Sequence, residues 1–183
     1  AGTQNTDITE ISGTSGEEGL TIEVFDATLG SLGTTTSTTG GAWTLSLGAG
    51  SELGEGTYSL TANATDAAGN PGPASDAVNV EVDTTAPDAP VITSPTASPP
   101  PRNTAIDEIS GTSGEEGLTI EVIDATLGSL GTTTSTTGGD WTLTLGTSLG
   151  EGTYSFTANA TDAAGNPGPA SDAVNVEVDT TAP

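Results

Sequence analysis

The stretch that decides the fold is residues 118–145, LTIEVIDATLGSLGTTTSTTGGDWTLTL. Residues 118–122 alternate apolar and polar side chains, which is the period of a strand with one buried face. A Thr-rich run at 130–137 follows, and the Gly138-Gly139 pair after it favours a tight hairpin turn. Apolar residues then return at every second position over 141–145. We therefore predict three successive strands.

The sequence on either side completes a unit of seven short strands. Alternating runs predict further strands at 90–94, 106–111, 154–160 and 174–178, and the proline-rich stretch 95–102 predicts a loop or an edge. Turn residues separate the runs at fairly even spacing, and no helical periodicity is present. This pattern is typical of an all-β sandwich. Ile123 has the wrong parity for its strand, which predicts a β-bulge there and at its equivalent Phe25.

The chain is an internal duplication. Residues 12–47 repeat at an offset of 98 with three differences in 36 positions, and residues 53–87 repeat at an offset of 96 with one difference in 35. The slip of two residues falls in the segment between these blocks, which predicts a surface loop. We expect two tandem domains, residues 1–85 and 86–183, joined by a short proline-containing linker.

The two repeats differ at one pair of large apolar positions and at the start of the first repeat. Phe25 becomes Ile123 where Leu60 becomes Phe156, so positions 25 and 60 are either neighbours that conserve core volume or sites of independent drift. Residues 1–6 offer no counterpart of Val91-Ile92. The first strand of domain 1 is therefore either missing or supplied by another chain through strand addition.

Composition excludes most binding partners. The chain has one basic residue against 25 Asp and Glu, a formal charge of −24, and no Cys or His. Such a chain is repelled by nucleic acid and by anionic membrane surfaces, and its natural small partner is a cation. No apolar run is long enough to span a bilayer, and no signal peptide is present. Both ends resemble linkers, so we expect an internal fragment, monomeric in isolation.

The chain contains few residues that are suited to catalysis. Without His, Cys or Lys, the triads, Schiff-base chemistry and His or Cys zinc sites are excluded. A glycosidase needs only two carboxylates, but its sugar cleft requires aromatic side chains. The two Trp, two Tyr and two Phe fall mostly on inward faces. We therefore expect no enzyme. Domains of this size have small cores and need added stability, and without Cys no disulfide can supply it. A bound metal ion is the remaining means.

Four phrases of the sequence resemble a known family. They are Ile109-Ser-Gly-Thr-Ser-Gly-Glu, Gly139-Asp-Trp-Thr-Leu, Ala160-Thr-Asp-Ala-Ala-Gly-Asn and Val82-Asp-Thr-Thr-Ala-Pro. Together they are similar to the bacterial Ig-like repeats that form the extender regions of giant secreted adhesins, including those exported with RTX-type signals. The resemblance implies immunoglobulin-like sandwiches, a non-catalytic spacer role and, for many members, calcium at domain junctions.

Strand counting places a candidate calcium site at the junction. The turn before 118–122, the hairpin turn and the loop at 162–169 share the N-terminal end of domain 2, and the last strand of domain 1 ends beside the linker. Calcium takes 6–8 hard oxygen ligands, while the same residues are also common in plain turns. The predicted ligands are Asp83, Glu115, Glu116, Asp162 and Asn166, with Asp88 weaker.

The duplication extends this site. Domain 1 should carry an equivalent half-site, and domain 2 should carry a matching donor at its far end. A second, weaker cation site is conceivable at the C-terminal end of domain 1. The half-site comprises Glu17, Glu18, Asp66 and Asn70, the donor is Asp179, and the weaker site comprises Asp26, Glu52 and Glu55.

These observations predict a structural extender on a bacterial surface. Its partners would be calcium ions and the neighbouring Ig-like repeats of the same chain, and its location would be extracellular. One alternative is a carbohydrate-binding module of a secreted protein, which requires solvent-facing aromatic residues. Another is a self-assembling filament subunit that borrows a strand from its neighbour.

Overall fold

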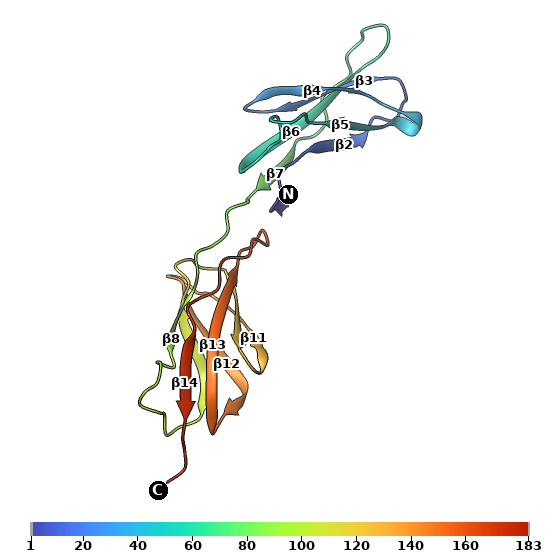
Figure 1. Ribbon diagram of the computed structural model, residues 1–183. Helices are drawn as coiled ribbons and strands as arrows, with labels where there is room; N and C mark the ends of the chain where they lie inside the picture. The colour runs from blue at the N-terminus through green and yellow to red at the C-terminus, as the bar shows by residue number, and fades with distance from the viewer. Residues whose placement is uncertain (1, 183) are drawn as a thin grey trace. The chain divides into compact units, whose positions relative to one another are not determined.

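The computed structural model describes residues 2–182 and divides into two compact units, residues 1–85 and 86–183 (Figure 1). Both units are built from β-strands, and the described part of the chain contains a single helical segment, the 3-10 turn η1 at Thr39–Gly41. The all-β prediction is confirmed. Over residues 2–182 there is no helix with the length and apolar character needed to cross a membrane.

Unit 2 is a sandwich of two sheets. One sheet has the order β11-β10-β13-β14 and the other has the order β12-β9-β8. Each of the seven predicted strands is present, most of them marked by apolar residues and β11 by its Thr-rich run. The strands are β8 Val91–Ser94, β9 Ile106–Thr112, β10 Thr119–Asp124, β11 Gly128–Thr134, β12 Asp140–Leu149, β13 Gly152–Thr161 and β14 Val174–Val178.

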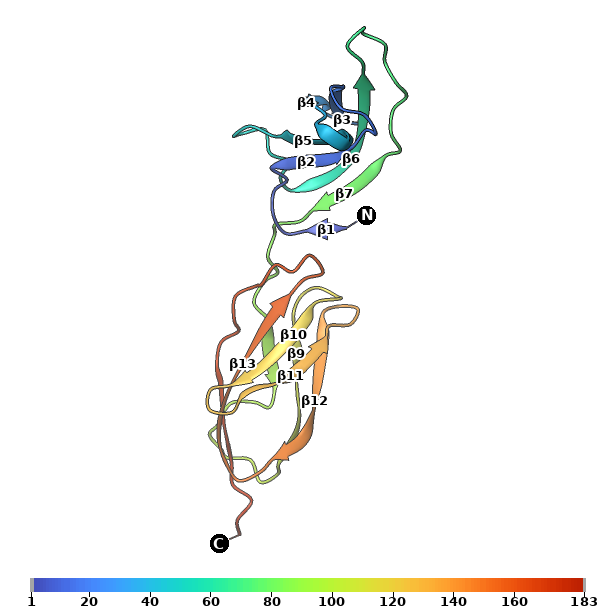
Figure 2. The ribbon, with the colours of Figure 1, turned by 90° about the vertical axis from the view of Figure 1, so that its right-hand side faces the viewer.

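Unit 1 repeats this plan with one change. Its larger sheet has the order β1-β7-β6-β3-β4, whereas the opposite sheet holds only β2 and β5. The short β1 runs parallel to β7, and Figure 2 shows the two side by side. The strands are β1 Thr3–Gln4, β2 Glu10–Thr14, β3 Thr21–Asp26, β4 Gly30–Thr36, β5 Ala42–Ser46, β6 Gly56–Thr65 and β7 Val78–Val82.

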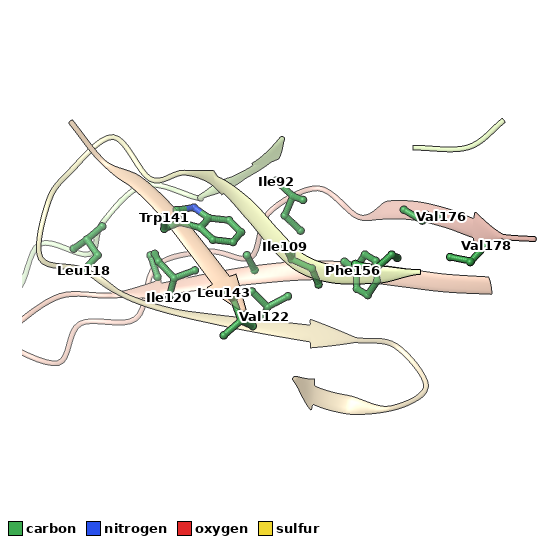
Figure 3. Close-up of a cluster of buried hydrophobic side chains, with 13 residues drawn as sticks. Ile92, Ile109, Leu118, Ile120, Val122, Trp141, Leu143, Phe156, Val176 and Val178 are labelled. Atoms are coloured by element: carbon green, nitrogen blue, oxygen red, sulfur yellow. The ribbon is translucent and has the colours of Figure 1, made fainter. Parts of the chain in front are cut away.

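The core of each unit lies between its two sheets. In unit 2, Trp141 is 2% exposed and Phe156 is fully buried, and Figure 3 shows Ile92 of β8 in the same cluster as Trp141 and Ile109. Burial of such side chains contributes about 1.5–3 kcal/mol each. Trp141 and Phe156, both predicted to face inward, are therefore core residues.

The predicted bulge is confirmed; positions 25 and 60 lie on adjacent strands, but the prediction that they conserve a shared core volume is wrong. The pairing of β3 with β4 shifts register between Val24 and Phe25. Leu60 is paired with Asp26 and shares its face of the sheet, because paired residues of adjacent strands point the same way. Phe25, one residue earlier, points to the opposite face. Side chains at positions 25 and 60 therefore cannot exchange volume within one core.

Candidate metal centre

The acidic turn and the predicted ligand loop of unit 2 lie at the same end of its larger sheet. Thr119, the first residue of β10, is paired with Thr161, the last residue of β13. The turn that precedes β10 therefore lies beside the loop that follows β13. Glu115 and Glu116 are both exposed in this turn, so their carboxylates face solvent at this end of the unit.

The loop after β13 is held together by its own side chains. Asp162 Oδ1 accepts hydrogen bonds from the backbone N–H groups of Gly165 and Asn166 at 2.8 and 2.9 Å. Asn166 Nδ2 donates to Asp162 Oδ2 at 2.8 Å, and Ala164 N–H also bonds the carboxylate. A carboxylate offers about four acceptor positions, so a metal ion would have to compete with the loop for Asp162.

The charge on Asp162 is stabilised by this loop. Burial opposes ionisation, but the hydrogen bonds from Asn166 and Gly165 outweigh it and lower the pKa of Asp162. Asp66 and Asn70 repeat the arrangement in unit 1, where Asn70 N–H and Nδ2 each donate to the carboxylate at 2.8 Å and lower the pKa of Asp66. The alternative that these residues simply stabilise turns therefore explains the presence of Asp66, Asn70, Asp162 and Asn166 without a metal ion.

The opposite end of unit 2 carries a second acidic group. Glu151 Oε2 accepts hydrogen bonds from the N–H and the hydroxyl of Thr180 at 2.8 and 2.9 Å. Asp179 Oδ1 accepts from Thr181 N–H at 3.1 Å, and the Asp179 side chain is within hydrogen-bonding reach of Glu151. The Thr180 N–H is the largest cause of the lowered pKa of Glu151. Two carboxylates are thus held next to each other at the point where the chain leaves the sandwich.

Unit 1 builds the same group where it ends. Glu55 Oε2 accepts from the N–H and the hydroxyl of Thr84 at 2.7 and 2.9 Å. Asp83 Oδ1 accepts from Thr85 N–H at 3.1 Å, and Asp83 N–H donates to the Gln4 carbonyl at 2.9 Å. The Asp-Thr-Thr phrase therefore folds the same way twice, with a glutamate from the Leu-Gly-Glu-Gly phrase beside it.

The remaining predicted ligands are spread over exposed turns. Glu17 and Glu18 lie exposed before β3, and Asp88 lies exposed between the buried Pro87 and Pro90. Asp26 is unsuited to metal binding, because it is 3% exposed and accepts hydrogen bonds from Thr28, Leu29 and Ser59. Over residues 2–182, no three acidic, His or Cys side chains form a group that could hold a metal ion. Neither unit alone therefore contains a complete centre.

Sequence reasoning underrated the glutamates at 55 and 151. It assigned Glu55 to a weaker second site and left Glu151 out, although both follow the same Leu-Gly pair and share the offset of 96 with Asp83 and Asp179. The hydrogen bonds from Thr84 and Thr180 show why the four residues belong together.

The sequence profile of the bacterial Ig-like domain matches residues 3–84 and, separately, residues 103–180. The chain belongs to the bacterial Ig-like domain family. Each match covers most of one unit, so both sandwiches are bacterial Ig-like domains. No curated protein matches the chain.

Several solved structures are similar to the chain. The fibronectin(III)-like modules of Clostridium thermocellum CbhA are 16% identical with a TM-score of 0.54, covering 97% of this chain and 87% of theirs. The BSP domain of a biofilm-associated protein is 25% identical with a TM-score of 0.41, covering 100% of this chain and 29% of its own. The chain thus spans under a third of the latter.

An adhesin of an Antarctic bacterium, described as Ca2+-stabilized and as binding ice, is 24% identical with a TM-score of 0.44. The match covers 94% of this chain and 44% of that one.

Proposed function

We propose that this chain is part of the extender region of a bacterial cell-surface adhesin, and that calcium stiffens the junction between its successive Ig-like domains. The domains would act as spacers outside the cell, without catalysis of their own. The observation that carries the proposal is the pair of acidic side chains at the C-terminal end of each domain. In each pair, one is the Asp that begins the Asp-Thr-Thr-Ala-Pro link, and the other is the glutamate bonded to the first Thr of that link.

The proposed ligands come from two successive domains. Asp83 and Glu55 would supply carboxylates from the end of domain 1, and Glu115 and Glu116 would supply them from the turn that begins β10. Asp162 and Asn166 would chiefly hold the neighbouring loop in shape. Calcium needs 6–8 oxygen ligands, more than either end provides alone, which is why a site shared by consecutive domains is proposed.

The covalent link sets the reach of such a site. Pro87 is buried in unit 2, where a Cβ added to Gly168 would lie 2.4 Å from the Pro87 carbonyl oxygen. Pro87 lies four positions after Asp83, a span of roughly 14 Å at full extension. Acidic groups tethered so closely repel each other, and a bound divalent cation would reverse that repulsion.

The aromatic residues favour this role over carbohydrate binding. Trp43, Trp141 and Phe156 are buried, and the Tyr58 and Tyr154 hydroxyls donate to backbone carbonyls at 2.9 and 3.0 Å. A carbohydrate-binding module needs aromatic rings that face solvent. The six aromatic side chains, all within residues 2–182, are buried or half-buried.

Calcium titration of matched variants tests the proposal. Asp83→Asn keeps the acceptor for Thr85 N–H but removes a charge from the proposed site, and we expect calcium affinity to fall about 10-fold or more. Asp179→Asn makes the same local change where the 183-residue chain used for the measurement has no following domain, so its effect should be much smaller. Calorimetry measures both affinities.

Small-angle scattering with calcium and then with chelator gives an independent readout. We expect the particle to become more flexible on chelation, and the Asp83→Asn chain to behave in calcium as the parent does in chelator. Equal calcium affinities for Asp83→Asn, Asp179→Asn and the parent, together with unchanged scattering profiles, would rule out the junction site.

A further inference from the structure

Each domain has two strands that end their sheets on the same side of the sandwich. In unit 1, β4 ends the larger sheet and β5 ends the smaller one. In unit 2, β11 and β12 hold the same places, and Figure 1 shows β11 at the outer edge of that unit. The strand β8, which only unit 2 has, joins its sheet at the opposite end from β12. The edges on the β4 side are therefore the same in both units.

Threonine hydroxyls close the edge of β5. Thr35 Oγ1 donates to the Thr44 carbonyl at 2.8 Å, and Thr38 Oγ1 donates to the Ala42 carbonyl at 2.9 Å. The same two bonds recur at β12 in unit 2. Carbonyl groups with which a further strand would have to pair are thus already occupied.

The edge of β4 is left open. Within residues 2–85, β4 pairs only with β3. Its register is regular from Gly33 to Thr36, so alternate backbone N–H and C=O groups there point away from β3. Thr34 and Thr36 are exposed, and the strand contains no Pro and no charged residue, although these are the usual protection of an edge. A further strand could therefore pair with β4.

The open edge lies in the longest stretch of the chain that carries no charge. Residues 27–51 contain no Asp, Glu, Lys or Arg, in a chain whose formal charge is −24. The counterpart stretch of repeat 2 ends earlier, at Asp140, which stands in place of Ala42 and is exposed. Like charges repel most strongly at contact distance, so two copies of this acidic chain meet the least repulsion at the β4 edge of unit 1.

Two carboxylates near this edge decide how a second copy can approach. Glu23 lies on the neighbouring β3, and its Oε1 accepts a hydrogen bond from the Ser31 hydroxyl at 2.6 Å. Glu17 is exposed in the turn beside the β4–β5 hairpin, where a Cβ added to Gly41 would lie 2.8 Å from Glu17 N. Antiparallel pairing of two β4 strands puts the two hairpins at opposite ends of the contact, which keeps the Glu17 side chains of the two copies apart.

From these observations we propose that the β4 edge of unit 1 binds the β4 edge of a second copy of this chain in antiparallel orientation. The contact is symmetric, so each strand offers the other the same uncharged residues, and Thr side chains form favourable cross-strand pairs. The regular segment is short, so the contact is weak, with a dissociation constant of about 1 mM. This association goes beyond the spacer role and does not involve calcium.

Sedimentation of the full chain in the presence of chelator tests the proposal. A salt concentration of about 0.5 M screens the general repulsion between the acidic molecules, and the chelator removes any effect of calcium. We expect a monomer at micromolar concentration and a reversible dimer at about 2 mM. In the dimer, hydrogen exchange should slow at β4 and remain unchanged at β5. A chain that is still monomeric at the highest concentration overturns the proposal.

Three Asp variants show whether the dimer uses this edge. Thr34→Asp places a charge in the middle of the edge and should abolish the dimer. Ala42→Asp introduces the residue that repeat 2 carries at Asp140 and should weaken the dimer about 3-fold or more. The control, Thr9→Asp, introduces the residue that repeat 2 carries at Asp107, adds the same net charge outside the edge, and should leave the dimer nearly unchanged. Equal dimerisation of all three variants overturns the proposal.

Disulfide formation gives a local readout, because the chain contains no Cys. Thr34→Cys places a single thiol on the open edge, and Thr9→Cys places one at another exposed position. At millimolar concentration, we expect Thr34→Cys to form covalent dimers about 10-fold faster than Thr9→Cys, because pairing raises the local thiol concentration. Equal rates of cross-linking would show non-specific encounters and would contradict the proposed contact.

Discussion

At the scale of single residues, a buried aspartate organises each domain. Asp124 is 2% exposed. Its Oδ1 accepts from the Thr126 and Leu127 N–H groups, both at 2.9 Å, and its Oδ2 accepts from Ser155 N–H at 2.8 Å. The carboxylate thereby ties the turn after β10 to β13. Asp26 makes the same three bonds in unit 1.

Asp124→Asn should destabilise unit 2 by about 2 kcal/mol, because an amide cannot accept on both sides of the group and the lost bonds are charge-assisted. Urea unfolding monitored by Trp fluorescence measures the loss. Asp172→Asn, at an exposed position, is the control and should change stability by less than about 0.5 kcal/mol. Similar effects of the two substitutions would refute the structural role of Asp124.

The same residues predict how stability depends on pH. Burial opposes the ionisation of Asp26 and Asp124, but their backbone hydrogen bonds prevail and lower the pKa of each below the ordinary value of 3.8. The unfolded state therefore binds protons first as pH falls. Their contribution is complete above about pH 5 and is lost as pH falls through the folded-state pKa.

Unfolding at pH values from 7 to 3 should accordingly show a steep acid loss in the parent chain and a shallower loss in Asp124→Asn. Identical acid slopes would mean that Asp124 does not hold a lowered pKa. Reduced repulsion among the many other carboxylates acts in the opposite direction, and the difference between the two chains removes that common effect.

Sequence reasoning missed the role of these aspartates. Asp26 was predicted as a weak cation ligand, because an acidic residue at a strand end looks the same in sequence whether it binds metal or backbone N–H groups. The register of β3 against β6 decides between these roles, since it places Ser59 N–H within reach of Asp26. The same register separates Phe25 from Leu60.

At the scale of elements, the hairpin between β11 and β12 is packed against the turn before β10. Gly139 has φ +83, and a Cβ on it would lie 2.6 Å from Gly114 N, which is a backbone atom. Gly138 has φ +90, with nothing within 4 Å of an added Cβ. Both glycines have a left-handed backbone conformation that would be strained for any residue with a Cβ, and they differ only in the space around them.

Gly138→Ala should therefore cost about 1 kcal/mol for the left-handed backbone alone. Gly139→Ala should cost a further 1–3 kcal/mol or so, because the backbone of the neighbouring turn has to move. Thermal or urea unfolding of the two single variants measures the difference. Equal destabilisation would show that the turns are not in close contact in solution.

The elements themselves were the most predictable part of the molecule. Most strands of unit 2 follow from apolar alternation, because a sandwich strand buries every second side chain, and β11 follows from its Thr-rich run before the Gly138-Gly139 turn. The short β1 could not be predicted in this way, since a strand of two residues has no period. Gln4 of β1 pairs with Val82 of β7, and Arg102 makes the equivalent bridge to Val178 of β14 in unit 2.

At the scale of the whole molecule, the large negative net charge affects the stability of the fold. A formal charge of −24 with a single basic residue gives self-repulsion that destabilises the compact state. Raising monovalent salt from 0.01 to 0.5 M shortens the screening length from about 30 Å to below 8 Å. The urea midpoint of both transitions should rise accordingly. A midpoint that does not change with salt would show that the charges are too far apart to matter.

The candidate site was less predictable than the fold. Strand counting brought Glu115 and Asp162 to one end of unit 2, because turns at the same end follow from strand order. It could not tell that Asp162 is engaged by its own loop or that Glu151 is fixed beside Asp179. Such choices among acceptors depend on atomic positions that no repeat pattern encodes.

The parallel contact between β1 and β7 has a mechanical consequence. Tension applied to the two ends of such a domain pulls these neighbouring strands in opposite directions. In unit 1, the bonds from Glu81 N–H to the Gly2 carbonyl and from Asp83 N–H to the Gln4 carbonyl would then be stretched together rather than opened one at a time. Such a shear geometry needs a larger force to open a domain than a geometry in which the bonds part in sequence from one end.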